Sequence, residues 1–326
     1  MRLGFAVKVL GREGLKSNDA RRWQNSPHLS VSVQYVDAIF DYLAEAKISM
    51  YRISSDFAPY LTHPEMPQFH NQLVEARADL EALGKRANEL NLRLSFHPSQ
   101  FILLNSPTEK TTAASLRDLN AQAEMLDIME QGPEAVVVTH VGGVYGDRDA
   151  ARARFVERFA LLSEPARRRL VLENDDASWG VADVLRIHES TGIRCIFDHQ
   201  HHNCINAGEG AVEACCDILQ TWPESQRPKI HYSSPRQEDR IIERKDKDGK
   251  RIQSSAAPLA SQHADYIDTS VFVPFARSVR EEVKRRGRDC GNDIPFDVMC
   301  EAKAKDLAVL QLKRDLTTEA PEIPIK

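Results

Sequence analysis

The chain has 326 residues, of which 42% are hydrophobic and 28% are charged, and its formal net charge at pH 7 is −5. This composition is typical of a soluble globular protein with a substantial core. No apolar run approaches the roughly 20 residues of a membrane-spanning helix, and no secretory signal is visible, so we expect a cytoplasmic protein with no membrane partner. The six cysteines form no C-x-x-C pair and are expected to be reduced. The acidic total argues mildly against a nucleic-acid partner, but basic residues gather in 12–22, 240–251 and 277–288.

Short β-rich runs alternate with longer helical patterns along the chain. The expected strands are Leu3–Val9, Ile48–Ser54, Leu92–Phe96, Ala135–Val141, Leu170–Asn174, Arg194–Asp198, Lys229–Ser233 and Asp297–Glu301. The expected helices are Tyr35–Ala46, Asn71–Leu90, Ala113–Met129, Arg152–Leu162, Ala182–Glu189, Gly210–Leu219, Phe272–Arg286 and Ala302–Leu310. This alternation predicts an α/β protein, a (β/α)8 TIM barrel in one domain. The domain is expected to span residues 1–314, with a charged inserted loop at 236–262 and a mobile tail at 315–326.

Six consecutive predicted strands end in a histidine or a carboxylate. These residues are His97, His140, Glu173, Asp198, His231 and Glu301. Because the carboxyl ends of barrel strands meet at one face, where barrel enzymes keep their chemistry, we expect the six side chains to converge there. His201 and His263 lie in loops that could return to the same point, and His202 is the alternative to His201.

Mixed histidine and carboxylate donors suit manganese, zinc or iron rather than calcium or magnesium. Eight donors exceed the three or four protein ligands of one zinc ion, so the sequence predicts two or three divalent ions. Such a site suits hydrolysis of a phosphodiester. The glycine-rich run Gly142–Gly146 lacks the pattern of a phosphate-binding loop, so no nucleotide cofactor is expected. We expect it to let the backbone turn closely after His140.

Several motifs together resemble those of the UV damage endonuclease family. They are His97-Pro-Ser-Gln-Phe101, Glu173-Asn-Asp175, Phe197-Asp-His-Gln-His-His202, Lys229-Ile-His-Tyr-Ser-Ser234 and Asp297-Val-Met-Cys-Glu-Ala-Lys303, with Arg2-Leu-Gly-Phe5 and Tyr51-Arg-Ile-Ser-Ser55 before them. The resemblance runs in chain order from the first strand to about Leu310. It departs from the family pattern after Phe5, where Ala6-Val7-Lys8-Val9 is less polar.

The resemblance implies a DNA repair endonuclease with a three-metal, manganese-loaded barrel that cuts damaged double-stranded DNA immediately 5′ to UV photoproducts. Cyclobutane dimers and 6-4 products are the expected lesions, abasic sites a further substrate, and a monomer the expected state. All eight donors become metal ligands, and Glu173 also bridges ions and holds the attacking hydroxide. Lys229 matches a lysine that is carboxylated in the family. Gln100 and Phe101 match a pair that probes the damaged stack, and Phe5 matches a lesion contact.

Other interpretations stay open at this stage. An abasic-site endonuclease of the endonuclease IV type, or a metal-dependent sugar isomerase or epimerase, could be built on the same barrel. A non-enzymatic DNA-binding barrel is disfavoured by the density of ligand-type residues. Lys229 could instead form an ion pair with Glu173 or Asp198, and Gln100 and Phe101 could belong to an ordinary loop.

Overall fold

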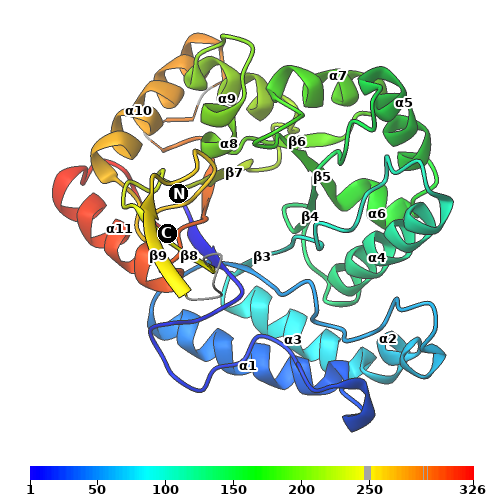
Figure 1. Ribbon diagram of the computed structural model, residues 1–326. Helices are drawn as coiled ribbons and strands as arrows, with labels where there is room; N and C mark the ends of the chain where they lie inside the picture. Colours follow the sequence, from blue (N-terminus) through cyan, green and yellow to red (C-terminus); the bar gives the residue numbers. More distant parts are fainter. Residues whose placement is uncertain (246–250, 289, 292) are drawn as a thin grey trace.

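A computed structural model shows a closed TIM barrel with helices around a central parallel sheet (Figure 1). The structure describes residues 1–245, 251–288, 290–291 and 293–326. The barrel strands are β1 (Leu3–Ala6), β2 (Met50–Arg52), β3 (Arg93–Phe96), β4 (Val136–Thr139), β5 (Leu170–Glu173), β6 (Arg194–Ile196), β7 (Lys229–Tyr232) and β10 (Asp297–Cys300). Each lies within a strand that the sequence predicts, so the predicted fold class is confirmed.

The eight strands pair in parallel in the order β6-β5-β4-β3-β2-β1-β10-β7. The barrel closes between the two ends of this order, where Asp198 pairs with His231 and the His231 N–H donates to the Phe197 carbonyl at 2.9 Å. Two predicted ligand residues therefore lie at the closing seam. Closure leaves no exposed edge in the central sheet.

The helices are α1 (Leu29–Glu45), α2 (Gln72–Glu75), α3 (Arg77–Glu89), α4 (Glu109–Ile128), α5 (Arg148–Phe159), α6 (Glu164–Arg169), α7 (Val181–Thr191), α8 (His199–Cys204), α9 (Ala211–Gln220), α10 (Thr269–Arg285) and α11 (Asp306–Glu319), with 3-10 turns at Trp23–Asn25 and Pro67–Phe69. The predicted helix Asn71–Leu90 is divided at Ala76 into α2 and α3. The short helices α6 and α8 were not expected. Among the described residues, no helix is both long and apolar enough to cross a membrane.

Apolar side chains pack on both sides of the barrel wall. Val136, Val138, Val171, Ile196 and Trp222 form an inner cluster, and a much larger cluster fills the layer between strands and helices. This double burial explains why the strands are almost continuously apolar. The polar side chains of these strands point inward at alternate positions, which concentrates polar groups on the barrel axis.

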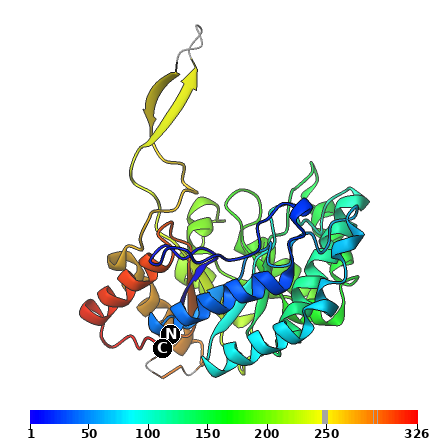
Figure 2. The ribbon, with the colours of Figure 1, turned by 90° about the horizontal axis from the view of Figure 1, so that it is seen from below.

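The charged insertion is a hairpin rather than an irregular loop. Strands β8 (Arg240–Lys245) and β9 (Arg251–Ala256) pair antiparallel through six residue pairs. Figure 2 shows the hairpin standing away from the barrel on the side opposite the chain termini. Because β1 begins beside the N-terminus, the hairpin rises from the face formed by the carboxyl ends of the strands.

The predicted domain boundary at residue 314 falls inside α11, which continues through Glu319. Beyond the helix, Ala320 and Ile323 are buried, and the Lys326 N–H donates to the Met1 carbonyl at 2.9 Å. The last residues thus lie against the amino-terminal face of the barrel. Their mobility stays a prediction.

A buried carboxylate organises that amino-terminal face. Asp297 is fully buried, accepts from the Arg2 N–H at 2.8 Å, and forms ion pairs with Arg93 at 2.9 Å and Arg227 at 2.7 Å. Burial by itself would raise the pKa of Asp297, but Arg93 and Arg227 lower it to about 2. Strands β1, β3 and β10 and the segment before β7 are thereby tied together.

We predict that Asp297→Asn destabilises the fold by about 3–5 kcal/mol, because it leaves buried guanidinium groups without their anion. The measurement is the free energy of unfolding in urea. Asp293→Asn, which removes a partly exposed carboxylate from the same face, is the control and is expected to cost less than about 1 kcal/mol.

The stability contributed by the Asp297 ion pairs should depend on pH. Because folding depresses the pKa of Asp297, its stabilising contribution is present above the unfolded value near 3.8 and is lost as pH falls toward 2. The difference between wild type and Asp297→Asn should shrink over this range by on the order of 2 kcal/mol. An unchanged difference between pH 5 and pH 2 would contradict the assignment.

Candidate metal centre

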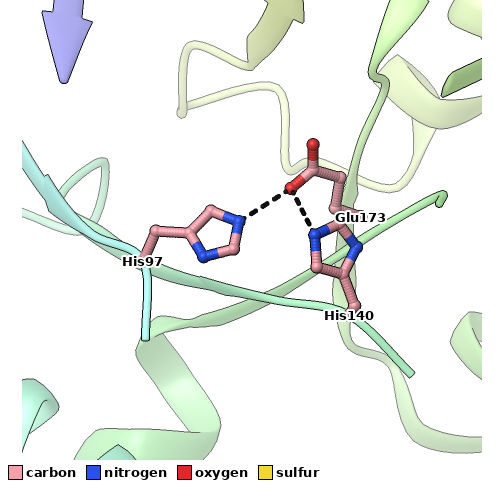
Figure 3. A group of neighbouring side chains, drawn as sticks. All are labelled: His97, His140 and Glu173. Carbon is pink, nitrogen blue, oxygen red and sulfur yellow. Dashed lines mark hydrogen bonds and ion pairs between the residues drawn. The ribbon is translucent and has the colours of Figure 1, made fainter. Parts of the chain in front are cut away.

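The predicted ligand residues lie at the carboxyl ends of neighbouring strands. His97 follows β3, His140 follows β4, and Glu173 is the last residue of β5. Figure 3 shows that the two imidazoles and the carboxylate point toward one another. The Nε2 atoms of His97 and His140 lie 3.2 and 3.6 Å from Glu173 Oε2. Two imidazoles that follow two neighbouring strands therefore meet at one carboxylate oxygen of a third strand.

The second oxygen of Glu173 faces the other side of the barrel. Glu173 Oε1 lies 2.7 Å from His231 Nδ1 and 3.6 Å from His201 Nδ1. His231 Nδ1 is also 3.3 Å from Glu301 Oε1. Glu173 is thus shared by three groups of donors that are close enough to hold a cation: His97, His140 and Glu173; Glu173, His231 and Glu301; and Glu173, Asp198 and His201.

The choice between two neighbouring histidines is decided by the short helix α8. Asp198 is its N-cap and accepts from the His201 N–H at 2.8 Å, as N-cap residues commonly do. This turn directs His201 Nδ1 toward Asp198 Oδ1, at 3.8 Å, and toward Glu173. His202 instead packs on Phe197 and faces Glu209. The structure therefore places His201, and not His202, in the cluster.

His263 is the one predicted ligand outside the three groups. It pairs with Pro235 at the base of the hairpin, and its Nδ1 bonds to the Glu301 carbonyl. Its Nδ1 is thereby anchored to the backbone of a ligand-type residue. A role for His263 as a metal ligand stays a prediction.

Arg52 is a member of the cluster that residue types alone did not single out. Its guanidinium lies 2.6 Å from Glu301 Oε1 and 2.8 Å from His231 Nε2. It occupies the inward position at the end of β2, within the Tyr51–Ser55 motif. The available signal was an arginine at an inward position of a barrel strand. Its partners are Glu301, which follows β10, and His231, which lies on β7. Neither strand pairs with β2, so these partners could be identified only once the strand order is known.

Three carboxylates, those of Glu173, Asp198 and Glu301, lie close together in the cluster and repel one another when ionised. Burial raises the pKa of Asp198 well above its usual value, and the charges of Glu173 and Glu301 raise it further. Burial would also raise the pKa of Glu173, but His231 and His140 hold it well below its usual value. The pKa of His201 rises to about 9 despite its burial, because Asp198 and Glu173 favour the imidazolium. Cations bound here would relieve the repulsion between carboxylates.

Unpaired buried atoms test whether the residues fit metal ions. Asp198 Oδ2 and His140 Nδ1 are buried and have no hydrogen-bond partner among the described residues. An unpaired buried carboxylate oxygen is costly, whereas a divalent ion would satisfy it. The donor set, with imidazoles and carboxylates on three sides of Glu173, therefore fits a polynuclear divalent-metal site.

Lys229 lies below this cluster on β7, one inward position before His231. It is fully buried, and its Nζ has no hydrogen-bond partner among the described residues. Burial lowers the pKa of Lys229 well below its usual value, and Arg52 and Arg93 lower it further. Within the described part of the chain no ion pair joins Lys229 to Glu173 or Asp198. The alternative that Lys229 serves only as an ion-pair partner of these carboxylates is therefore not supported.

The predicted DNA-contact residues have two different environments. Gln100 and Phe101 are exposed in the loop after β3, and Phe101 is 73% exposed. Phe5 is fully buried, with its ring 5.5 Å from that of Tyr51 in an edge-on contact. A ring inside the barrel wall cannot reach a lesion. We therefore correct the assignment of Phe5, which is a core residue that supports β1.

The glycine-rich run after β4 makes the close turn that the sequence predicts. Gly142 has a φ of 108°, and a Cβ there would lie 2.2 Å from Asn105 Oδ1. Its carbonyl accepts from Trp179 Nε1 at 2.5 Å, and the Gly143 carbonyl accepts from Asn105 Nδ2 at 2.7 Å. The turn holds the segment after His140 against its neighbours on both sides.

The fold and the cluster define a class: a TIM barrel whose carboxyl-end face gathers histidines and carboxylates that could hold a metal ion. A profile of the family described as UV-endonuclease UvdE matches residues 29–323. The chain belongs to this family.

Relatives named UV DNA damage endonuclease support the same placement. The Bacillus pumilus protein is 34% identical over 280 residues, which cover 83% of this chain and 75% of that protein. The Bacillus mycoides protein is 32% identical over 289 residues, which cover 88% and 81% respectively.

Solved structures confirm the architecture. The crystal structure of SacUVDE aligns with a TM-score of 0.78 and 28% identity, covering 97% of this chain and 98% of that one. Endonuclease IV from Thermus thermophilus aligns with a TM-score of 0.55 at 14% identity, over 98% of this chain and 100% of that one. At this lower identity the likeness concerns the fold alone.

We predict that His201→Gln lowers the amount of divalent metal bound per chain, whereas His202→Gln does not, because only His201 faces Glu173. Metal content after equilibration with Mn²⁺ and gel filtration is the measurement. A second readout is the rise in melting temperature on adding Mn²⁺, which follows binding to the folded state. Equal metal content in the two variants would refute the placement.

Proposed function

We propose that the protein is a metal-dependent DNA repair endonuclease that hydrolyses the phosphodiester immediately 5′ to UV photoproducts in double-stranded DNA. The observation that carries the proposal is the Glu173-centred cluster at the carboxyl-end face in a chain of the UV-endonuclease family. Cyclobutane dimers and 6-4 products are the proposed lesions, and abasic sites a further substrate. The enzyme is proposed to act as a monomer.

The cluster fits two or three divalent ions, with Mn²⁺ as the proposed metal and Zn²⁺ as the alternative. Such ions supply a hydroxide at neutral pH and neutralise the charge that develops on the phosphodiester. Glu173 is common to all three donor groups, so it would be the residue shared between bound ions and could orient the attacking water. Arg52 holds Glu301 and His231 in place through hydrogen bonds to both.

Damage recognition is assigned to the loop after β3. Phe101 presents an exposed aromatic ring next to exposed Gln100, four residues beyond His97. Damaged bases unstack at a lower cost than intact ones, so a ring inserted at the gap favours a lesion. Since His97 and Phe101 share one short loop, insertion there would bring the neighbouring phosphate to the metal centre.

Lys229 is proposed to be carboxylated. Its Nζ is buried and has no hydrogen-bond partner among the described residues. Burial and the charges of Arg52 and Arg93 lower its pKa, so a neutral amine is favoured, and this is the form that can add carbon dioxide. The negative carbamate would suit the two guanidinium groups. Intact-mass measurement under native conditions, with and without bicarbonate, should detect the added carboxyl group, and a single unmodified mass under both conditions would rule it out.

A plasmid nicking assay tests the proposed function. We expect conversion of supercoiled to nicked plasmid only when the DNA has been irradiated and Mn²⁺ is present, and no conversion with EDTA. Nicking of abasic but not of irradiated DNA would favour an abasic-site endonuclease. Hydrogen exchange into a sugar without any nicking would favour an epimerase.

Two variants separate chemistry from recognition in this assay. Glu173→Gln should abolish nicking while leaving binding of irradiated DNA measurable, because the DNA contacts remain. Phe101→Ala should lower the preference for irradiated over intact DNA by roughly 5- to 150-fold, corresponding to about 1–3 kcal/mol for one aromatic stacking contact, while metal content is unchanged. Retained turnover in Glu173→Gln would remove its assigned role.

A further inference from the structure

The hairpin β8–β9 projects from the same face that carries the metal centre (Figure 2). Each strand has six residues, so the hairpin extends about 20 Å at the usual rise per residue. That length corresponds to roughly 6 base pairs of duplex DNA. The hairpin is therefore long enough to follow a duplex that lies across the metal centre.

Side-chain contacts between its two strands help to maintain the shape of the hairpin. Gln253 Nε2 donates to Glu243 Oε1 across the two strands at 3.1 Å, and Ser255 Oγ donates to Asp239 Oδ2 at 2.5 Å. Glu243, Arg251, Gln253, Ser254 and Ser255 are exposed, and Ile241 is 72% exposed. A two-stranded ribbon with this much free surface is only marginally stable by itself, so we expect a partner to cover it.

The base of the hairpin is anchored beside the metal centre. The Arg236 N–H donates to the Gln262 carbonyl at 2.8 Å, and the Ala264 N–H donates to the Ser234 carbonyl at 2.8 Å. Pro235 pairs with His263, whose ring bonds to the Glu301 carbonyl. The chain runs from His231 to Ser234 into the hairpin and returns at His263, so the position of the hairpin is tied to that of the cluster.

The charge of this segment differs in sign from that of the whole protein. Residues 236–251 contain seven basic and five acidic residues, a net formal charge of +2, whereas the chain carries −5. Arg240, Arg244, Lys245 and Arg251 belong to the two strands, and Lys245 is paired with Arg251 in the register. A basic ribbon on an acidic protein is complementary to a polyanion.

We propose that the β8–β9 hairpin is a DNA-binding arm that contacts the backbone of the duplex beside the cleavage site. The proposal rests on the proposed function, because it requires a duplex at the metal centre. A two-stranded β-ribbon fits the major groove, and basic residues along it can contact phosphates on either side. These contacts position the duplex and add affinity without reading sequence.

A hairpin deletion tests the arm. Because Arg240 is paired with Ala256, the two ends lie about 5 Å apart, and residues 240–256 can be replaced by Asn-Gly, which favours a tight hairpin turn. We measure binding of undamaged duplex by fluorescence anisotropy in EDTA, where no cutting occurs, across a range of salt concentrations. We expect at least tenfold weaker binding at about 0.1 M salt and a shallower salt dependence.

Charge variants keep the hairpin and remove its proposed contacts. Lys245→Gln with Arg251→Gln should reduce the slope of log affinity against log salt by about 1.8, the value for two lost phosphate contacts. Arg77→Gln with Lys85→Gln is the matched control, since both residues are exposed on α3. It should leave the slope nearly unchanged. Circular dichroism and melting temperature confirm that every variant is folded.

Shortened duplexes locate the contact. Wild type should bind more weakly when one flank beside the lesion is cut below the ~6 base pairs that the arm spans. The deletion variant should be insensitive to the same truncation. This outcome would not arise from a general loss of positive charge.

Unchanged DNA affinity and salt slope in the deletion variant would overturn the proposal of a DNA-binding arm. The proposal would also fail if wild type were a dimer that the deletion dissociates without affecting DNA binding. If wild type nicks irradiated plasmid while the arm variants bind like wild type, only the arm is refuted. If wild type neither nicks nor binds DNA, the proposed function fails as well. The two failures are therefore distinguishable.

Discussion

The site depends on one constraint: the buried carboxylate of Glu173 is shared by imidazoles from four different segments. Both of its oxygens have imidazole neighbours, with His97 and His140 on one side and His231 and His201 on the other. A carboxylate that is 1% exposed is costly unless it is paired. The parallel strands bring the partners together because their carboxyl ends meet at one face.

The two ends of the barrel handle buried charge in opposite ways. At the amino-terminal face, the negative charge of Asp297 is balanced by Arg2, Arg93 and Arg227. At the carboxyl-end face, three carboxylates share the cluster, and one oxygen of Asp198 has no hydrogen-bond partner in the part of the chain that the structure describes. The first arrangement holds strands together, whereas the second is suited to binding cations. This contrast supports the assignment of chemistry to one face of the barrel.

Local patterns predicted more of the barrel than of the surface around it. The barrel strands could be recognised because both of their faces are buried, which requires almost continuous apolar runs. A histidine or carboxylate at the end of such a run therefore stands out. The hairpin within 236–262 was expected to be a loop, because charged strands with two exposed faces lack the alternation that reveals a half-buried strand. Phe5 was assigned by analogy, but the side of the barrel wall that its ring occupies depends on the register of β1 against β2.

The amino-acid sequence by itself determined the fold class and the chemical types of the groups at the strand ends, because these follow from periodicity and residue identity. Only the tertiary structure decided which of those groups meet. It turned His201 rather than His202 toward Glu173, brought Arg52 to Glu301 and His231, left His263 on the backbone of Glu301, and raised the hairpin above the site. These outcomes depend on side-chain direction and closure of the barrel, which arise from contacts between residues far apart in the chain.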